Sequence, residues 1–252
     1  MATTTSIAVA ATPLVLQLLY RADDALILGH RLSEWTGHAP TLEEELALAN
    51  IALDLIGQAR ALYGYAGTLT GHGEDQLAYL RDAAAWRNCL MVELPNGDFA
   101  FSIARLLLVS AFADPFWRGA MASSDGTIAA VAAKAEKETA YHLRHSAEWL
   151  IRLGDGTAES HRRARTALDD LWPYTGELFT SLPGEAGIAP DPNSLRDTWN
   201  ATVSGILARA TLERPTDGWM QSGGRDGRHT ENLGHLLAEM QFLQRSYPDA
   251  TW

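Results

Sequence analysis

A carboxylate and two imidazoles stand at helical spacing in the segment "KAEKETAYHLRHSAEWL", residues 134–150. Glu138, His142 and His145 follow one another at intervals of four and three residues, so on a helix they lie on neighbouring turns. Carboxylate oxygens and imidazole nitrogens together are ligands for iron or zinc. The spacing is compatible with a metal site, with the remains of one, and with an ordinary polar helix face.

A di-iron carboxylate site places stricter demands on a sequence. It takes a Glu from each of two helices and a Glu-x-x-His from each of two others, all pointing into a helical bundle. The sequence contains no Glu-x-x-His, and its one Asp-x-x-His lies in a glycine-rich segment. Where the motif is wanted on a helix, Asp54 is followed by Gly57 and Glu138 by Tyr141. The ligand set for two irons is therefore incomplete.

Two interpretations of this region remain. In the first, Glu138 pairs with Lys134 four residues earlier, His142 hydrogen-bonds to a neighbour, and the stretch is a vestigial site without metal. In the second, Asp54, Glu138 and His142, with Asp24 as a further candidate, hold one metal in a degenerate oxidase or oxygenase. Elemental analysis of the purified protein distinguishes them.

A second candidate site lies in "SGGRDGRHTENLG", residues 222–234. Its glycines and two arginines, Arg225 and Arg228, precede a predicted helix, and backbone amides together with guanidinium groups can bind a phosphate. The segment matches neither the P-loop nor the dinucleotide-binding motif. It is either a phosphate site or a turn whose arginines make contacts locally or between subunits.

Long helices are expected to carry all of these residues. Apolar residues recur at helical spacing almost throughout, and turn residues separate the helical segments. We predict an all-α fold in which residues 1–12 form a flexible tail and residues 13–252 form one domain around a four-helix bundle. The predicted helices are 13–35, 42–67, a segment through Trp86 and Met91, 99–120, 126–153, 161–182, 192–213 and a last one from Thr230.

The second helix is predicted to place an apolar stripe, which includes Leu46, Ala49 and Leu53, against the core. Asp54 follows directly and is expected to face inward as well. A buried carboxylate needs a polar partner, and Arg105 in the apolar fourth helix is a candidate by residue type.

Composition narrows the classes of function. Lys and Arg number 20 against 31 Asp and Glu, giving a formal charge of -11, which opposes binding to nucleic acid or to an anionic membrane surface. No uninterrupted apolar run is long enough for a membrane span. The single cysteine, Cys89, excludes an intramolecular disulfide and is expected to be buried, which fits a cytoplasmic protein.

Several long segments resemble one family of proteins. The chain is similar, from about residue 14 to its end, to the PaaC subunits of ring-1,2-phenylacetyl-CoA epoxidases, which act in aerobic phenylacetate breakdown. The segments that carry the resemblance are "LILGHRLSEWTGHAP", "LANIALDLIGQAR", "VELPNGDFAFSIAR", "YHLRHSAEWLIRLGDGT" and "GGRDGRHTENLGHLLAEMQFLQR".

The resemblance implies a ferritin-like fold and a noncatalytic, structural role in a cytoplasmic multicomponent monooxygenase. In that family the related PaaA subunit holds the di-iron centre and binds phenylacetyl-CoA, and a reductase supplies electrons from NADPH. No cofactor is expected in this chain, because Gly57 and Tyr141 stand where PaaA-type ligands belong. The resemblance also makes the phosphates of CoA the candidate ligand of Arg225 and Arg228.

Overall fold

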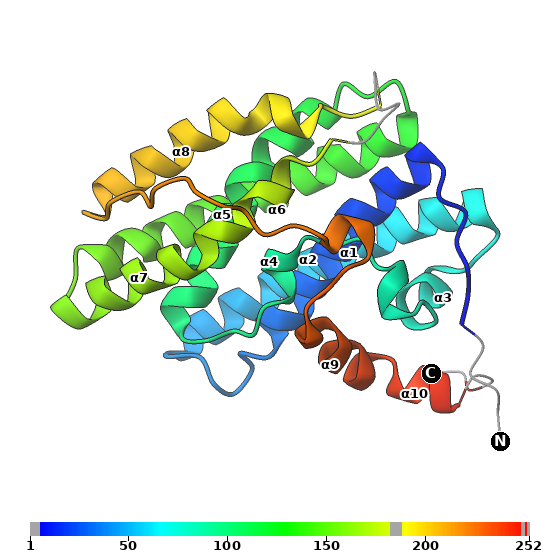
Figure 1. Ribbon diagram of the computed structural model, residues 1–252, viewed down its shortest axis with the longest axis horizontal. Coiled ribbons are helices and arrows are strands. Elements are labelled where there is room, and N and C mark those ends of the chain that lie inside the picture. Colours follow the sequence, from blue (N-terminus) through cyan, green and yellow to red (C-terminus); the bar gives the residue numbers. More distant parts are fainter. Residues whose placement is uncertain (1–5, 182–187, 248–249, 251–252) are drawn as a thin grey trace.

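The computed structural model describes residues 6–181, 188–247 and 250, and this part of the chain is all-α, without a β-strand. Figure 1 shows its helices arranged lengthwise, with the C-terminal pair below them. The elements are α1 (Pro13–Ser33), α2 (Leu42–Thr70), α3 (Glu74–Tyr79), η1 (Ala83–Ala85), α4 (Leu90–Glu93), α5 (Phe99–Ala120), α6 (Gly126–Gly154), α7 (Ala158–Leu171), η2 (Trp172–Phe179), η3 (Pro192–Leu195), α8 (Arg196–Arg209), η4 (Gly224–Asp226), α9 (Glu231–Met240) and α10 (Phe242–Ser246).

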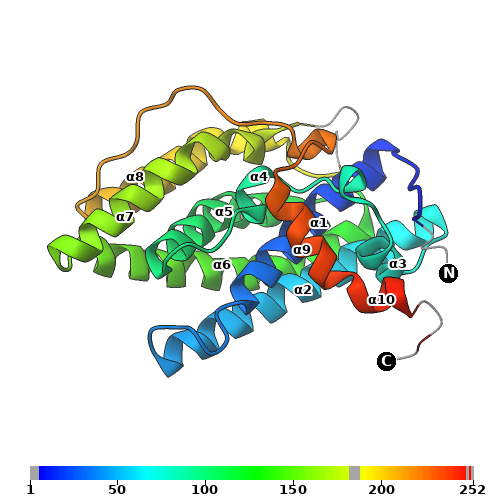
Figure 2. The same cartoon turned by 60° about the horizontal axis from the view of Figure 1, so that its bottom comes forward.

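Four long helices, α1, α2, α5 and α6, form the predicted bundle. Short loops join α1 to α2 and α5 to α6, and each of these pairs packs together along its length (Figures 1 and 2). The connection from α2 to α5, residues 71–98, is long and contains α3, η1 and α4. One long crossover between two helical hairpins is the topology of ferritin-like bundles. The predicted fold class is confirmed.

Polar caps determine where the long helices begin. The side chains of Thr12, Thr41, Asp98 and Asp125 each accept a hydrogen bond from a backbone N–H of the first turn, and Pro13 occupies the first position of α1. Capping satisfies amides that have no partner inside the helix, and proline lacks the amide that would need one. The predicted starts of these four helices are confirmed.

The third predicted helix is wrong. Residues 80–89 leave the helical path because their backbone amides bond to carboxylates of α1: the Arg87 amide donates to Asp23 and the Cys89 amide to Asp24, each at 2.7 Å. These two bonds replace the amide-to-carbonyl bonds that a continuous helix would make. Tertiary partners therefore override the local helical pattern, and only the short helices α3, η1 and α4 form.

The predicted orientation of α2 is also partly wrong. Leu46 and Leu53 are 58% and 66% exposed, and Leu42 is 68% exposed, whereas Leu48 and Leu55 lie in the core. The helix carries leucines on two sides, so apolar spacing alone did not identify the buried one. The face that the bundle buries lies opposite the exposed leucines.

The apolar fourth predicted helix is α5, and it lies in the protein interior as expected. Its length and composition would suffice for a membrane span, but 72% of its most apolar window is buried inside the protein. Such burial is the behaviour of a core helix.

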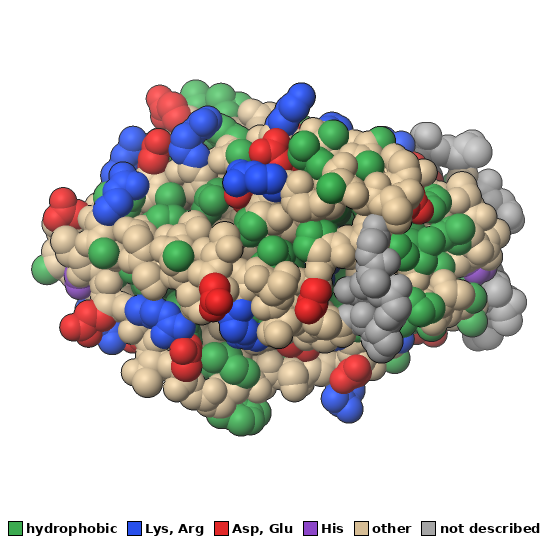
Figure 3. Space-filling view, turned by 90° about the horizontal axis from the view of Figure 1, so that it is seen from above, with side chains coloured by type: hydrophobic (Ala, Val, Ile, Leu, Met, Phe, Trp, Pro, Cys, Tyr) green, Lys and Arg blue, Asp and Glu red, His purple; other side chains and the backbone are tan. Residues whose placement is uncertain are grey.

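The surface of the protein carries charges of both signs. On the face seen in Figure 3, positive and negative side chains are interspersed, so no field of one sign covers that face.

Residues 6 and 7 contact the segment that follows α3. The Ile7 amide donates to the Leu80 carbonyl oxygen at 3.0 Å, and the Ser6 hydroxyl donates to the Asp82 carboxylate at 2.7 Å. Residues 1–5 of the predicted flexible tail lie outside the described residues.

Candidate functional site

The predicted ligand Glu138 lies on α6 where this helix packs against α2. Its Oε2 accepts a hydrogen bond from Gln58 Nε2 at 2.9 Å, and its Oε1 is 3.4 Å from Lys134 Nζ. The predicted pairing with Lys134 is therefore confirmed. Gln58 was missed, although it stands four residues after Asp54 and one helical turn along the same face of α2. An amide and an ammonium group satisfy the carboxylate.

His142 and Asp54 meet across the same seam between α2 and α6. His142 Nε2 lies 3.1 Å from Asp54 Oδ2, the imidazole is buried, and the carboxylate is 36% exposed. Arg105 is not the partner of Asp54. Its guanidinium donates instead to the Leu94 carbonyl oxygen and the Asn96 side chain, and burial followed by the charge of Arg31 lowers the pKa of Arg105 to about 9.

The third member of the helical trio, His145, lies 3.2 Å from the Glu44 carboxylate near the start of α2. Burial lowers the pKa of His145, and the Glu44 charge offsets part of that effect. Tyr141, at the position of a missing ligand, is 38% exposed. A Cβ atom at Gly57 would stand 3.7 Å from Lys134 Nζ, so a histidine there would meet an ammonium group.

The two arginines of the glycine-rich segment have different environments in the structure. Arg225 is buried and forms two bonds to the Asp24 carboxylate, at 2.7 and 2.9 Å. Burial by itself would lower the pKa of Arg225, but the Asp24 charge raises it above the ordinary value. Arg228 is 74% exposed at its side chain and lies 3.0 Å from Asp226. Of these two arginines, only Arg228 is exposed enough to bind a phosphate group from solution.

These partnerships decide how well the predicted residues fit a metal. Asp54 and His142 meet, but Glu138 is bound to an amide and an ammonium group, and Asp24 to a guanidinium. Within the described part of the chain, no three His, Cys, Asp or Glu side chains come together as metal ligands. The donor set does not fit a metal centre.

A buried ion pair inside the bundle was also missed. Asp23 accepts hydrogen bonds from Arg81 and from the Tyr63 hydroxyl, each at 2.6 Å, and neither charged side chain is exposed. Burial, followed by the Asp23 charge, raises the pKa of Tyr63 well above its ordinary value. Two adjacent aspartates in an apolar helix were the available signal, because buried carboxylates need partners. Their partners, Arg81 and Arg225, are too distant in sequence to be identified from spacing.

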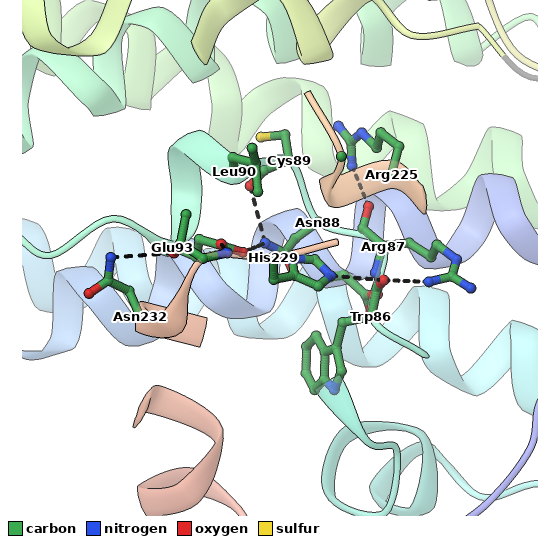
Figure 4. Close-up of polar contacts among 12 residues, drawn as sticks. Trp86, Arg87, Asn88, Cys89, Leu90, Glu93, Arg225, His229 and Asn232 are labelled. Carbon is green, nitrogen blue, oxygen red and sulfur yellow. Dashed lines mark hydrogen bonds and ion pairs between the residues drawn. The ribbon is translucent and has the colours of Figure 1, made fainter. Parts of the chain in front are cut away.

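A third polar cluster joins the crossover connection to the segment before α9. Glu93, which is fully buried, accepts hydrogen bonds from the Asn88 side chain, the Thr230 amide and His229 (Figure 4). Glu177 accepts two more from the amides of Gly223 and Leu90. Hydrogen bonds to two buried carboxylates, Glu93 and Glu177, therefore fix the position of the glycine-rich segment.

Comparison with known proteins identifies the family of this chain. The family model for phenylacetic acid catabolic proteins, PaaA_PaaC, matches residues 1–252. The chain is 48% identical over 236 residues to a subunit of the 1,2-phenylacetyl-CoA epoxidase of Escherichia coli (strain K12), covering 91% of this chain and 95% of that protein. The chain therefore belongs to the PaaA_PaaC family of phenylacetic acid catabolic proteins.

Proposed function

We propose that this chain is a noncatalytic, structural subunit of a multicomponent monooxygenase that epoxidises the ring of phenylacetyl-CoA in aerobic phenylacetate breakdown. The extent and degree of its identity to an epoxidase subunit support this role. The Glu138 carboxylate supports the noncatalytic part of the proposal, because a metal would have to displace Gln58 and Lys134 from it.

The observation that carries the proposal is the α2 ridge, which we define as Leu42, Leu46 and Leu53. At 100° per residue these side chains fall within about 40° of one another on the helix. All three are more than half exposed. Ala49 and Gly57 lie between and beyond them on the same side, and small residues let a second helix approach closely. Exposed apolar side chains in a line are typical of an interaction surface.

The occupant we propose for the ridge is a helix of a PaaA-type subunit, which would hold the di-iron centre and bind phenylacetyl-CoA. A reductase would complete the complex as a further partner. No cofactor is assigned to this chain, and we place the complex in the cytoplasm. In this arrangement the chain acts on catalysis through the position of its partner's helices, as subunits of obligate complexes do.

Coexpression with a PaaA-type subunit and affinity purification test the proposal. Leu46→Asp with Leu53→Asp should weaken the complex by about tenfold or more, since charge in a desolvated apolar contact is costly. Phe242→Asp, an equally exposed apolar position on α10, is the matched control and should leave binding unchanged. Full assembly with the double ridge variant would contradict the assignment of the ridge.

A further inference from the structure

His229 lies between α4 and α9 with both ring nitrogens engaged. Its Nδ1 is 2.8 Å from Glu93 Oε2, and its Nε2 is 3.1 Å from the Trp86 carbonyl oxygen. The imidazole is 4% exposed and the carboxylate is not exposed. Figure 4 shows the ring between the Glu93 side chain and the backbone of Trp86. Each ring nitrogen therefore contacts an oxygen atom in an environment shielded from solvent.

The chemistry of these oxygens fixes where the protons lie. A backbone carbonyl oxygen can only accept, so Nε2 must donate to Trp86. Glu93 also accepts from the Thr230 amide at 2.7 Å and from Asn88 Nδ2 at 2.8 Å. Hydrogen bonds from several N–H groups favour a carboxylate over a carboxylic acid, so Nδ1 must donate as well. A neutral imidazole has one N–H, and only the imidazolium has two.

The other charged groups of this region have partners of their own. Arg87 Nη1 donates to the Trp86 carbonyl oxygen, at 2.7 Å, and to the Ala84 carbonyl oxygen, and not to Glu93. Asp24 on α1 is bound to Arg225, and Glu177 on η2 receives two backbone amides. Arg31 donates to the backbone carbonyl of Glu93, not to its carboxylate. The charge that balances the buried Glu93 carboxylate therefore comes from the ring of His229.

We propose that Glu93 and His229 form a proton-dependent clasp that holds the start of α9 on the bundle; Gln241 and Arg245 fix α10 through their own hydrogen bonds. While the ring carries two protons, it joins the chain just before α9 to α4 and to the Trp86 backbone. Loss of one proton leaves a nitrogen lone pair against the Trp86 carbonyl oxygen, or leaves Glu93 with one donor fewer. Raising the pH should therefore loosen the clasp, and lowering it should restore the contact.

Ring-nitrogen NMR of the full chain with 15N-labelled histidine tests the protonation state directly. His235, exposed on α9, serves as the internal reference. At neutral pH both nitrogens of His229 should give protonated signals, because each faces an acceptor oxygen. A neutral pattern for His229 at that pH, whether with one ring N–H or opposite a protonated Glu93, would overturn the proposal. This measurement needs only the wild-type chain.

Hydrogen exchange tests the mechanical consequence. His229→Gln keeps one N–H donor without the charge, and the amides of Thr230 to Met240 should exchange about tenfold or more faster than in the wild type. His235→Gln is the matched control on the same segment and should exchange as the wild type does. In the wild type, protection corrected for intrinsic exchange should fall as His229 loses its proton. Protection that is independent of that titration would contradict the clasp.

Discussion

At the scale of single residues, partners within one helical turn were predictable and partners from distant segments were not. Lys134 and Glu138 are four residues apart, so their contact follows from helix geometry. Asp54 was expected beside Arg105 but lies beside His142, because the choice among distant partners depends on how the helices pack. The absence of a complete ligand set could also be predicted, because Glu-x-x-His, like the Lys134 contact, is a pattern within a single helix.

Substitution of the two arginines distinguishes a structural from a binding role. Arg225→Ala should lower the free energy of unfolding by about 3–5 kcal/mol, because it leaves the largely buried Asp24 carboxylate without the guanidinium that donates two hydrogen bonds to it. Arg228→Ala should leave stability nearly unchanged, and urea denaturation measures both. If Arg228 contacts CoA, its loss should also weaken binding of a CoA ester to the complex. Equal stability of the two variants would contradict the buried ion pair.

The seam between α2 and α6 predicts the metal content. Protein purified from iron-supplemented cells should contain far less than one iron per chain, because Glu138 and Asp24 are bound to cationic groups. Elemental analysis measures this. One iron per chain that disappears in the Glu138→Gln, His142→Gln variant would instead favour a degenerate oxidase.

At the scale of elements, caps and turns could be predicted, but the environment of a helix face could not. Thr41 begins α2 as expected, because capping is local. Leu46 and Leu53 were assigned to the core because α2 has two apolar faces, and a sequence pattern does not say which of them the bundle buries. The crossover connection does not form the predicted helix, because its backbone amides bind Asp23 and Asp24, which are more than 60 residues away in the sequence.

The α2 and α6 seam should also be sensitive to acid. Burial lowers the pKa of His145 below its ordinary value of 6.5, so the unfolded chain binds a proton more readily than the folded one. Stability should therefore be fully present above about pH 6.5 and fall as the pH drops below it. Denaturation of His145→Gln across this range should show a shallower fall than the wild type, with His235→Gln as control. Identical pH profiles would contradict the seam's role.

At the scale of the whole molecule, the all-α class and the bundle followed from periodicity, and the exposed ridge came only from the structure. Asp54, Glu138 and His142 contact one another's helices or a cation, while three leucines of α2 are exposed to solvent. These two features are the ones on which the proposed structural role rests.

Turnover of phenylacetyl-CoA by the reconstituted complex tests the central claim most directly. Omitting this chain should abolish epoxidation by the catalytic subunit. A chain with Asp54→Asn, Glu138→Gln and His142→Gln should restore turnover close to that of the wild type, because the proposed structural role requires no oxygen chemistry of these side chains. Loss of turnover in a complex that assembles normally with this triple variant, or full turnover without the chain, would contradict the account.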